Sequence, residues 1–143
     1  MVYIAWLALT YLIGAMPFGL LVAQMFCRID PRKLGSKNTG ATNVARTCGL
    51  KYGLLVLVLD ILKGYLPVLT AMSFSHSTFF LSLTALAAVL GHMYSVFLYG
   101  KGGKGVATTI GVFLALVPKA MLLALPVCIA IIFLTGYVSL GSI

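Results

Sequence analysis

Long apolar runs without charge are the feature that most restricts how this chain can fold. The segment from Val2 to Phe26 carries no charged side chain and exceeds the roughly 20 residues that a helix needs to cross a bilayer. Over all 143 residues, 62% are hydrophobic and only 8% are charged, which lies far outside the range of soluble proteins. The sequence therefore predicts an all-α, polytopic membrane protein with a single domain over residues 1–143.

The apolar runs divide into five expected helices. They extend from Val2 to Phe26, from about Tyr52 to Ala71, from about Phe79 to Leu98, from about Ala107 to Val117 and from about Ala120 to Leu134. Pro118 and Lys119 separate the last two. The fourth helix is too short for a simple crossing, so we expect it to tilt little, to begin deep in the protein or to end below the interface. Gly14 and Pro17 are candidates to bend the first.

Basic residues set the expected orientation. The segment from Cys27 to Lys51 holds six of the ten basic residues and a single acid, Asp30. Because cytoplasmic loops are rich in Lys and Arg, we expect this segment in the cytoplasm and the N-terminus outside. The net charge of +8 lies beside membrane spans, so anionic lipid head groups and phosphorylated substrates are the expected partners, and nucleic acid is not.

The cysteines lack the spacing of a metal site. Cys27, Cys48 and Cys128 lie in or beside apolar segments, without a CxxC or Cys/His pattern. We expect buried or reduced thiols, and no metal.

The stretch from Lys33 to Arg46, here called the first loop, is polar and cationic between two apolar spans. Its glycines allow backbone N–H groups to turn toward a ligand, and its short polar side chains add neutral hydrogen-bonding groups. These residues are Gly35, Ser36, Asn38, Gly40, Thr42 and Asn43. Arg46 could hold two phosphate oxygens at once. The pattern predicts a phosphate site. The alternative is a loop whose basic residues only fix topology, but topology alone does not require the neutral polar residues.

A second glycine-rich stretch, from Gly100 to Gly105, opens directly onto an apolar helix and is called the second loop. Gly102, Gly103 and Gly105 alternate with Lys101 and Lys104. Backbone N–H groups, the positive end of a helix and a lysine together favour anion binding. No Gly-Lys pair is followed by Ser or Thr, so the stretch fails the pattern of nucleotide triphosphatases. By alternation of sides, both loops are expected in the cytoplasm.

Three ionisable residues fall within the expected spans. Asp60 and Lys63 are three positions apart, hence on one helical face, where they can neutralise each other and should point into the bundle. Structural pairing explains them, and so does a contribution of Lys63 to the positive potential beneath the first loop. His92 is either a core histidine with a hydrogen-bonded partner or a residue that supports the active end.

Taken together, these stretches resemble the bacterial acyl phosphate:glycerol-3-phosphate acyltransferases. The resemblance covers Leu34 to Val44, Arg46, the Asp60-x-x-Lys63-Gly64 step and Gly102 to Thr108, in matching order and spacing. It implies a multi-helix inner-membrane enzyme that transfers a fatty acyl group from acyl phosphate to the 1-hydroxyl of glycerol 3-phosphate and forms lysophosphatidate. It also implies no cofactor, an acyl chain lying between helices in contact with lipid, and a proton taken up by the phosphate of the donor.

The resemblance also implies roles for particular residues. Ser36, Arg46 and Lys104 would hold the phosphates, and Ser142, or else Ser139, would complete the pocket. The glycines of the second loop would let backbone N–H groups approach the substrate.

Two departures from the family accompany the resemblance. Members usually continue into two further helices and a third signature stretch with His and Asn, so we expect the chain to lack these elements. Ser95 stands where the family commonly has proline, which we expect to alter only local helix geometry.

Two other functions remain open: a transporter or channel for a phosphorylated anion, and a noncatalytic membrane subunit.

Overall fold

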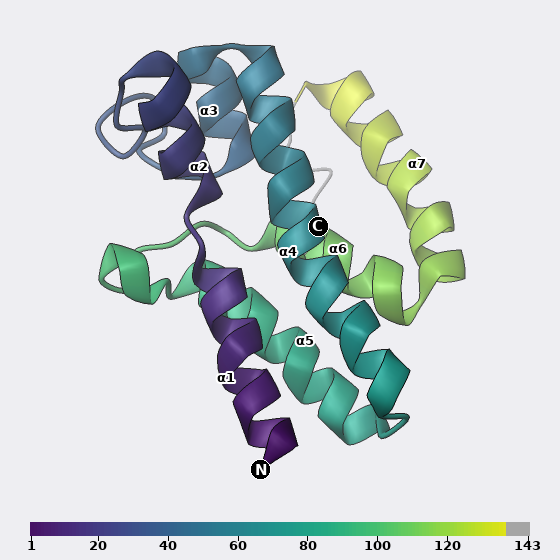
Figure 1. The fold of residues 1–143 in the computed structure, drawn as a ribbon. Coiled ribbons are helices and arrows are strands. Elements are labelled where there is room, and N and C mark those ends of the chain that lie inside the picture. The colour runs from purple at the N-terminus through teal and green to yellow at the C-terminus, as the bar shows by residue number, and fades with distance from the viewer. Residues whose placement is uncertain (137–143) are drawn as a thin grey trace.

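The computed structural model describes residues 1–136 and is built from helices (Figure 1). In chain order they are α1 (Val2–Ala15), α2 (Phe18–Val22), the π-helical turn η1 (Ala23–Cys27), α3 (Ala41–Cys48), α4 (Leu50–Phe74), α5 (Thr78–Met93), the 3-10 turn η2 (Val96–Leu98), α6 (Val106–Leu116) and α7 (Pro118–Thr135). Ser139 and Ser142 lie outside the described residues.

The expected spans are confirmed as helices. Within residues 1–136, four helical stretches are long and apolar enough to cross a membrane, namely Val2–Cys27, Leu50–Phe74, Thr78–Leu98 and Pro118–Thr135. The shorter apolar helix α6 corresponds to the expected fourth span. In Figure 1 it begins at about half the height of the bundle, behind α4, which matches the expectation of a helix that starts deep in the protein.

Helix α4 is the centre of the bundle, with α1 and α5 on one side and α6 behind it (Figure 1). Val68 of α4, Ala88 of α5 and Val112 of α6 form a buried apolar cluster where the three helices meet. A Cβ atom on Gly64 would overlap the carbonyl oxygen of Thr108, so the backbones of α4 and α6 approach closely only because position 64 has no side chain.

The first span is interrupted at Met16 and Pro17, as expected from the proline. Proline has no N–H and cannot continue the helical ladder, so α1 ends at Ala15 and α2 begins at Phe18. Gly14 has a different role: a Cβ atom there would overlap the carbonyl oxygen of Ala88, so this glycine allows close packing against α5.

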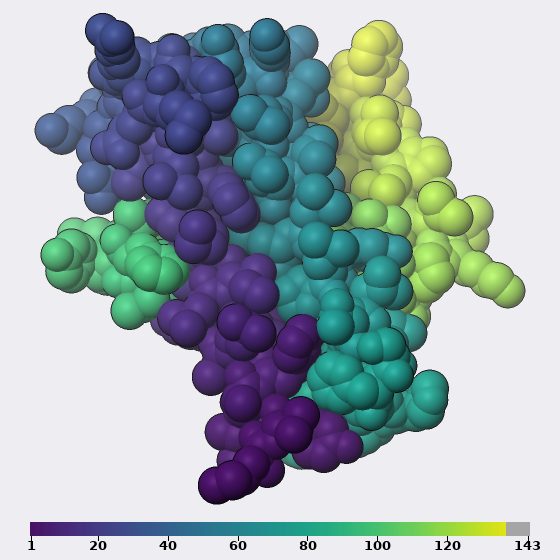
Figure 2. Space-filling model, viewed as in Figure 1, coloured from purple at the N-terminus to yellow at the C-terminus, as the bar shows by residue number. Residues whose placement is uncertain are grey.

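The outer surface of the bundle is apolar. Large side chains such as Leu54, Leu66, Phe113 and Leu123 are exposed, as is usual for helices that face lipid. Helix α7 lies along one side, at the right of Figures 1 and 2, and none of its residues is buried.

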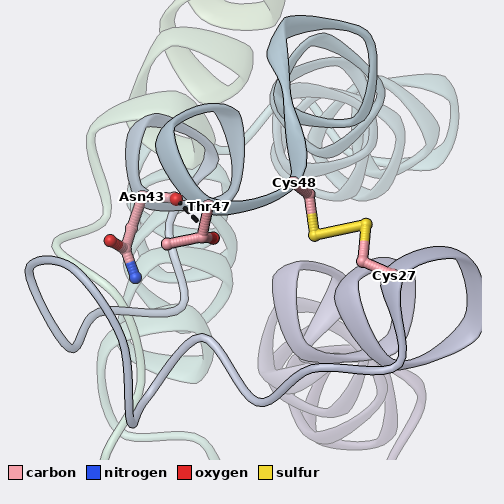
Figure 3. The surroundings of a disulfide bond; sticks show 4 residues. All are labelled: Cys27, Asn43, Thr47 and Cys48. Carbon is pink, nitrogen blue, oxygen red and sulfur yellow. Dashed lines mark hydrogen bonds between the residues drawn. A yellow bond between two sulfur atoms is a disulfide. The ribbon is translucent and has the colours of Figure 1, made fainter.

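The expectation of reduced thiols is wrong for two of the three cysteines. Cys27, at the end of η1, and Cys48, at the end of α3, form a disulfide with Cα atoms 6.0 Å apart (Figure 3). They are 21 positions apart, and the chain between them folds back so that the two helix ends meet. Cys128 is a free thiol, as expected.

Candidate functional site

The first loop is organised by the side chain of Asn43, which is 2% exposed and lies in the first turns of α3. Its amide nitrogen donates to the carbonyl oxygens of Pro31, Leu34 and Asn38, at 2.8, 3.1 and 2.8 Å. Its Oδ1 accepts from the backbone N–H of Ser36 at 2.9 Å. Figure 3 shows this side chain directed into the loop, away from the disulfide. The loop therefore holds its shape without a strand or helix of its own.

Gly35 is required by this arrangement for two reasons. Its φ of 56° lies in the left-handed region, which side chains disfavour, and a Cβ atom would overlap Oδ1 of Asn43. Gly35 therefore brings the backbone of Ser36 to Asn43, and the hydroxyl of Ser36 remains exposed.

The predicted residues of the first loop separate into two groups. Ser36, Thr42 and Arg46 are exposed and available to a ligand. The side chains of Asn38 and Asn43 bind the backbone of the loop, with Oδ1 of Asn38 accepting from Gly40 N–H at 2.9 Å. Neutral polar residues thus build the loop, and a smaller set can face a phosphate.

The second loop is attached to the end of α5 by its backbone. The N–H of Gly102 donates to the carbonyl oxygen of Met93 at 3.0 Å, and that of Gly103 donates to the carbonyl oxygen of His92 at 3.1 Å. These two N–H groups are therefore engaged within the protein. Within the described chain, the N–H groups of Lys104 and Gly105 have no such partner and precede the open first turn of α6.

Residues from both loops line one small cavity. Thr39 from the first loop and Gly102 and Gly103 from the second face it, together with Asp60 and Lys63 of α4. In Figures 1 and 2 the two loops lie on the same side of the molecule, one directly below the other, beside the break in the first span. Segments more than 60 positions apart in the sequence thus form one site.

The predicted pairing of Asp60 with Lys63 is confirmed. Nζ of Lys63 lies 2.8 Å from Oδ1 of Asp60, and both side chains are 3% exposed. Nδ1 of His92 lies 3.7 Å from the same carboxylate oxygen and makes no hydrogen bond in the described structure. His92 therefore lies against the wall of the site rather than in a self-contained core.

Asp30 does not neutralise the cations of the site. Its carboxylate accepts hydrogen bonds from the guanidinium and the backbone N–H of Arg32, and the guanidinium bond lowers the pKa of Asp30 to about 2. Among residues 1–136, Arg46, Lys101 and Lys104 have no acidic partner. Their charges are available to an anion. The described residues 1–136 contain no cluster of three or more His, Cys, Asp or Glu side chains that could bind a metal.

Two contributors were not singled out as site residues from the sequence. Thr39, which is 6% exposed, lines the cavity, and Ser95, which is 1% exposed, donates from Oγ to the carbonyl oxygen of Ala15 at 2.5 Å. Besides any effect on local helix geometry, Ser95 therefore makes a hydrogen bond to the first span, which was not predicted from the sequence. In the sequence, the signal that pointed to Ser95 was that serine stands where the family commonly has proline.

Comparison with known proteins gives one consistent family. A family model described as glycerol-3-phosphate acyltransferase matches residues 4–143. A glycerol-3-phosphate acyltransferase from Solidesulfovibrio magneticus is 63% identical over 139 residues, which cover 97% of this chain and 70% of that protein. One from Nitratidesulfovibrio vulgaris is 60% identical, over 96% of this chain and 42% of that protein.

Two solved structures share the fold. The crystal structure of PlsY, an integral membrane glycerol 3-phosphate acyltransferase, in its glycerol 3-phosphate form has a TM-score of 0.94 and 45% identity, over 99% of this chain and 71% of that one. The lysophosphatidic acid form has a TM-score of 0.91 and 44% identity, over 99% and 70%.

Proposed function

The chain belongs to the glycerol-3-phosphate acyltransferase family, and we propose that it transfers a fatty acyl group from acyl phosphate to the 1-hydroxyl of glycerol 3-phosphate, forming lysophosphatidate. The observation that carries the proposal is the meeting of the two cationic loops at one cavity, in a fold that matches a glycerol 3-phosphate form at 45% identity. Both substrates carry phosphate. Arg46 and Lys104 are exposed cations of the two loops, although the cavity itself is lined by other residues of these loops and by Lys63.

The reaction requires little covalent chemistry from the protein. The hydroxyl oxygen attacks the carbonyl carbon of acyl phosphate, a new ester C–O bond forms, and the bond from that carbon to the phosphate oxygen breaks. Phosphate leaves with the electron pair and takes up the hydroxyl proton. Because the donor is already activated, holding both substrates together and neutralising their charge supplies most of the rate enhancement.

The exposed residues of the loops suit this task. The guanidinium of Arg46 can bind two phosphate oxygens, the hydroxyl of Ser36 can donate to a third, and Lys104 supplies a point charge. The N–H groups of Lys104 and Gly105 and the first turn of α6 present further donors to an anion. Ser142 and Ser139 remain predicted members of the pocket. The acyl chain would lie against lipid-facing helices, in contact with membrane lipids.

We also propose an orientation. The protein is a multi-pass membrane protein, and the concentration of basic residues between the first two spans favours a cytoplasmic site with the N-terminus outside. Soluble glycerol 3-phosphate would then reach the loops from the cytoplasm.

A direct assay tests the function. The whole protein, reconstituted in liposomes, is given acyl phosphate and labelled glycerol 3-phosphate, and both lipid product and trapped label are measured. We expect labelled lysophosphatidate and no accumulation of free label in the lumen. Uptake without lipid product would establish the transporter instead, and neither product nor uptake would favour the noncatalytic subunit.

A further inference from the structure

The break in the first span takes two backbone carbonyls out of the regular helical hydrogen-bond pattern. In an unbroken helix the carbonyl oxygens of Ala15 and Met16 would accept from the N–H groups four positions later. Instead, the carbonyl oxygen of Ala15 accepts from Oγ of Ser95. That of Met16 accepts from the backbone N–H of Phe18 at 3.1 Å and also from Nζ of Lys63 at 2.9 Å. Lys63 therefore connects the midpoint of α4 to the point where the first span changes direction.

We propose that Lys63 is a positioning residue for the phosphate site, and that its hydrogen bond to Met16 sets the relative placement of the two loops. The inference rests on the proposed function and names a residue that acts through the loops rather than on the substrate. The buried position supports it: the ammonium group is 3% exposed, held by Asp60 on one side and 5.5 Å from the centre of the Phe18 ring. Charged residues in membrane spans are rare, usually paired, and often mark functional sites.

The connection to the second loop runs through His92. Its ring lies between the Asp60 carboxylate and Gly103: Nδ1 is 3.7 Å from Oδ1 of Asp60, and a Cβ atom on Gly103 would overlap Nε2. Its carbonyl oxygen accepts from Gly103 N–H. Any shift of the Asp60 and Lys63 pair therefore reaches the backbone just before Lys104.

The connection to the first loop runs through α2. This short helix begins directly after the break, and a Cβ atom on Gly19 would overlap the carbonyl oxygen of Thr39. The first loop is thus in backbone contact with α2, whose starting point is fixed by the bond from Lys63 to Met16. Thr39 faces the same cavity as Lys63.

The role of the pair is geometric rather than electrostatic. Asp60 lies in direct contact with Lys63 and offsets its charge, so the two together add little field at the loops. Replacing both with neutral residues should preserve the charge of the site and still disturb it. This separates the inference from a simple contribution of Lys63 to phosphate attraction.

The test compares two double variants that differ in one property. Both variants carry Asp60→Asn, and they differ at position 63: the Met variant has Lys63→Met and the Gln variant has Lys63→Gln. Both remove the buried charges, and Met and Gln have similar volumes. Only Gln can donate to the carbonyl oxygen of Met16. Thr84→Val, a fully buried substitution on α5 away from the loops, serves as the matched control. Each whole protein is assayed for lysophosphatidate formation, after wild-type turnover has been established.

We expect the Met variant to raise KM for glycerol 3-phosphate about tenfold or more, equivalent to roughly 1.4 kcal/mol, with the Gln variant closer to wild type. Thr84→Val should keep KM within about twofold, near the scatter of surface and distant substitutions. Wild-type KM in the Met variant, or equal KM in the Met and Gln variants, would overturn the inference. Inactive wild-type protein would count against the proposed function alone.

A readout that does not depend on activity completes the test. Lys101 and Lys104 are exposed and are cleavage points for trypsin. If the pair positions the second loop, cleavage there should be faster in the Met variant than in the Gln variant, wild type or Thr84→Val. Equal cleavage rates in all four proteins would overturn the inference even if none of them were active.

Discussion

Oδ1 of Asn43 accepts a hydrogen bond from the backbone N–H of Ser36 at 2.9 Å, so a buried amide sets the backbone beneath an exposed serine. The same side chain donates to three carbonyl oxygens of the loop. One residue therefore stabilises a segment that has no regular secondary structure between η1 and α3.

Asn43→Asp should be more harmful than Asn43→Ala. The carboxylate keeps an acceptor for Ser36 but loses the amide donor and places negative charge against the carbonyl oxygens of Pro31, Leu34 and Asn38. Leaving such buried groups unpaired costs about 1–3 kcal/mol each, and more for a charge. Thermal unfolding in detergent measures the effect, and an Asp variant as stable as wild type would contradict it.

Arg46→Ala and Lys104→Ala should each abolish most turnover while the protein stays folded. Each loses a charge-assisted contact to phosphate, for which about 2–4 kcal/mol, or roughly 30- to 1,000-fold in rate, is typical. Lys104→Arg should also lose turnover, because the planar guanidinium group does not replace the compact ammonium charge of lysine beside the glycines. Lys119→Ala, a basic residue at the start of α7, is the control and should keep normal activity. If Arg46→Ala kept the wild-type rate, Arg46 would not bind phosphate and would serve only to fix the topology of the protein.

Ser95 should tolerate proline better than alanine. Both substitutions remove the hydrogen bond to the carbonyl oxygen of Ala15, which costs about 1–3 kcal/mol when the group is buried. The φ of Ser95 is already −61°, which suits proline, so Ser95→Pro should recover about 0.4–1 kcal/mol through a less flexible unfolded chain. The free energies of unfolding of Ser95→Pro and Ser95→Ala are measured under the same conditions. A proline variant less stable than the alanine variant would contradict the prediction.

In the purified, oxidised protein, the disulfide should contribute to the stability of the first loop. It encloses the segment between Cys27 and Cys48, and a cross-link over a loop of this length is worth about 3 kcal/mol. A dithiol reductant should lower the unfolding temperature of wild type and leave the variant with both cysteines changed to serine unaffected. Equal responses would mean that the bond carries no stability.

Labelling at the two ends of the bundle tests the orientation. Single cysteines at positions 37 and 77, in a protein otherwise free of cysteine, should react from the cytoplasmic and the outer side respectively. The proposed orientation also predicts that Cys27 and Cys48 are kept reduced in cells, as cytosolic thiols are, so a disulfide found in cells would count against this orientation. Reaction of position 37 from outside would reverse the proposed orientation.

The sequence predicted the helices and the Asp60 to Lys63 pair well because both depend on local patterns. Runs of apolar residues define spans, and a spacing of three places two side chains on one helical face. The disulfide, the bond from Ser95 to Ala15 and the convergence of the loops depend on contacts between distant segments. Composition also suggested that Asn38 and Asn43 face a ligand, whereas the geometry shows them binding the loop backbone.

The interrupted first span has a consequence for the order of membrane assembly. The carbonyl oxygens of Ala15 and Met16 receive their side-chain partners from Ser95 and Lys63, which are synthesised much later. Until Ser95 has been placed, the carbonyl oxygen of Ala15 would be unpaired in hydrocarbon, at a cost of several kcal/mol, whereas that of Met16 keeps the N–H of Phe18. Because Ser95 lies near the end of the third span, the bond that completes the bend forms only after that span has been made, so formation of the site is a late event in biogenesis.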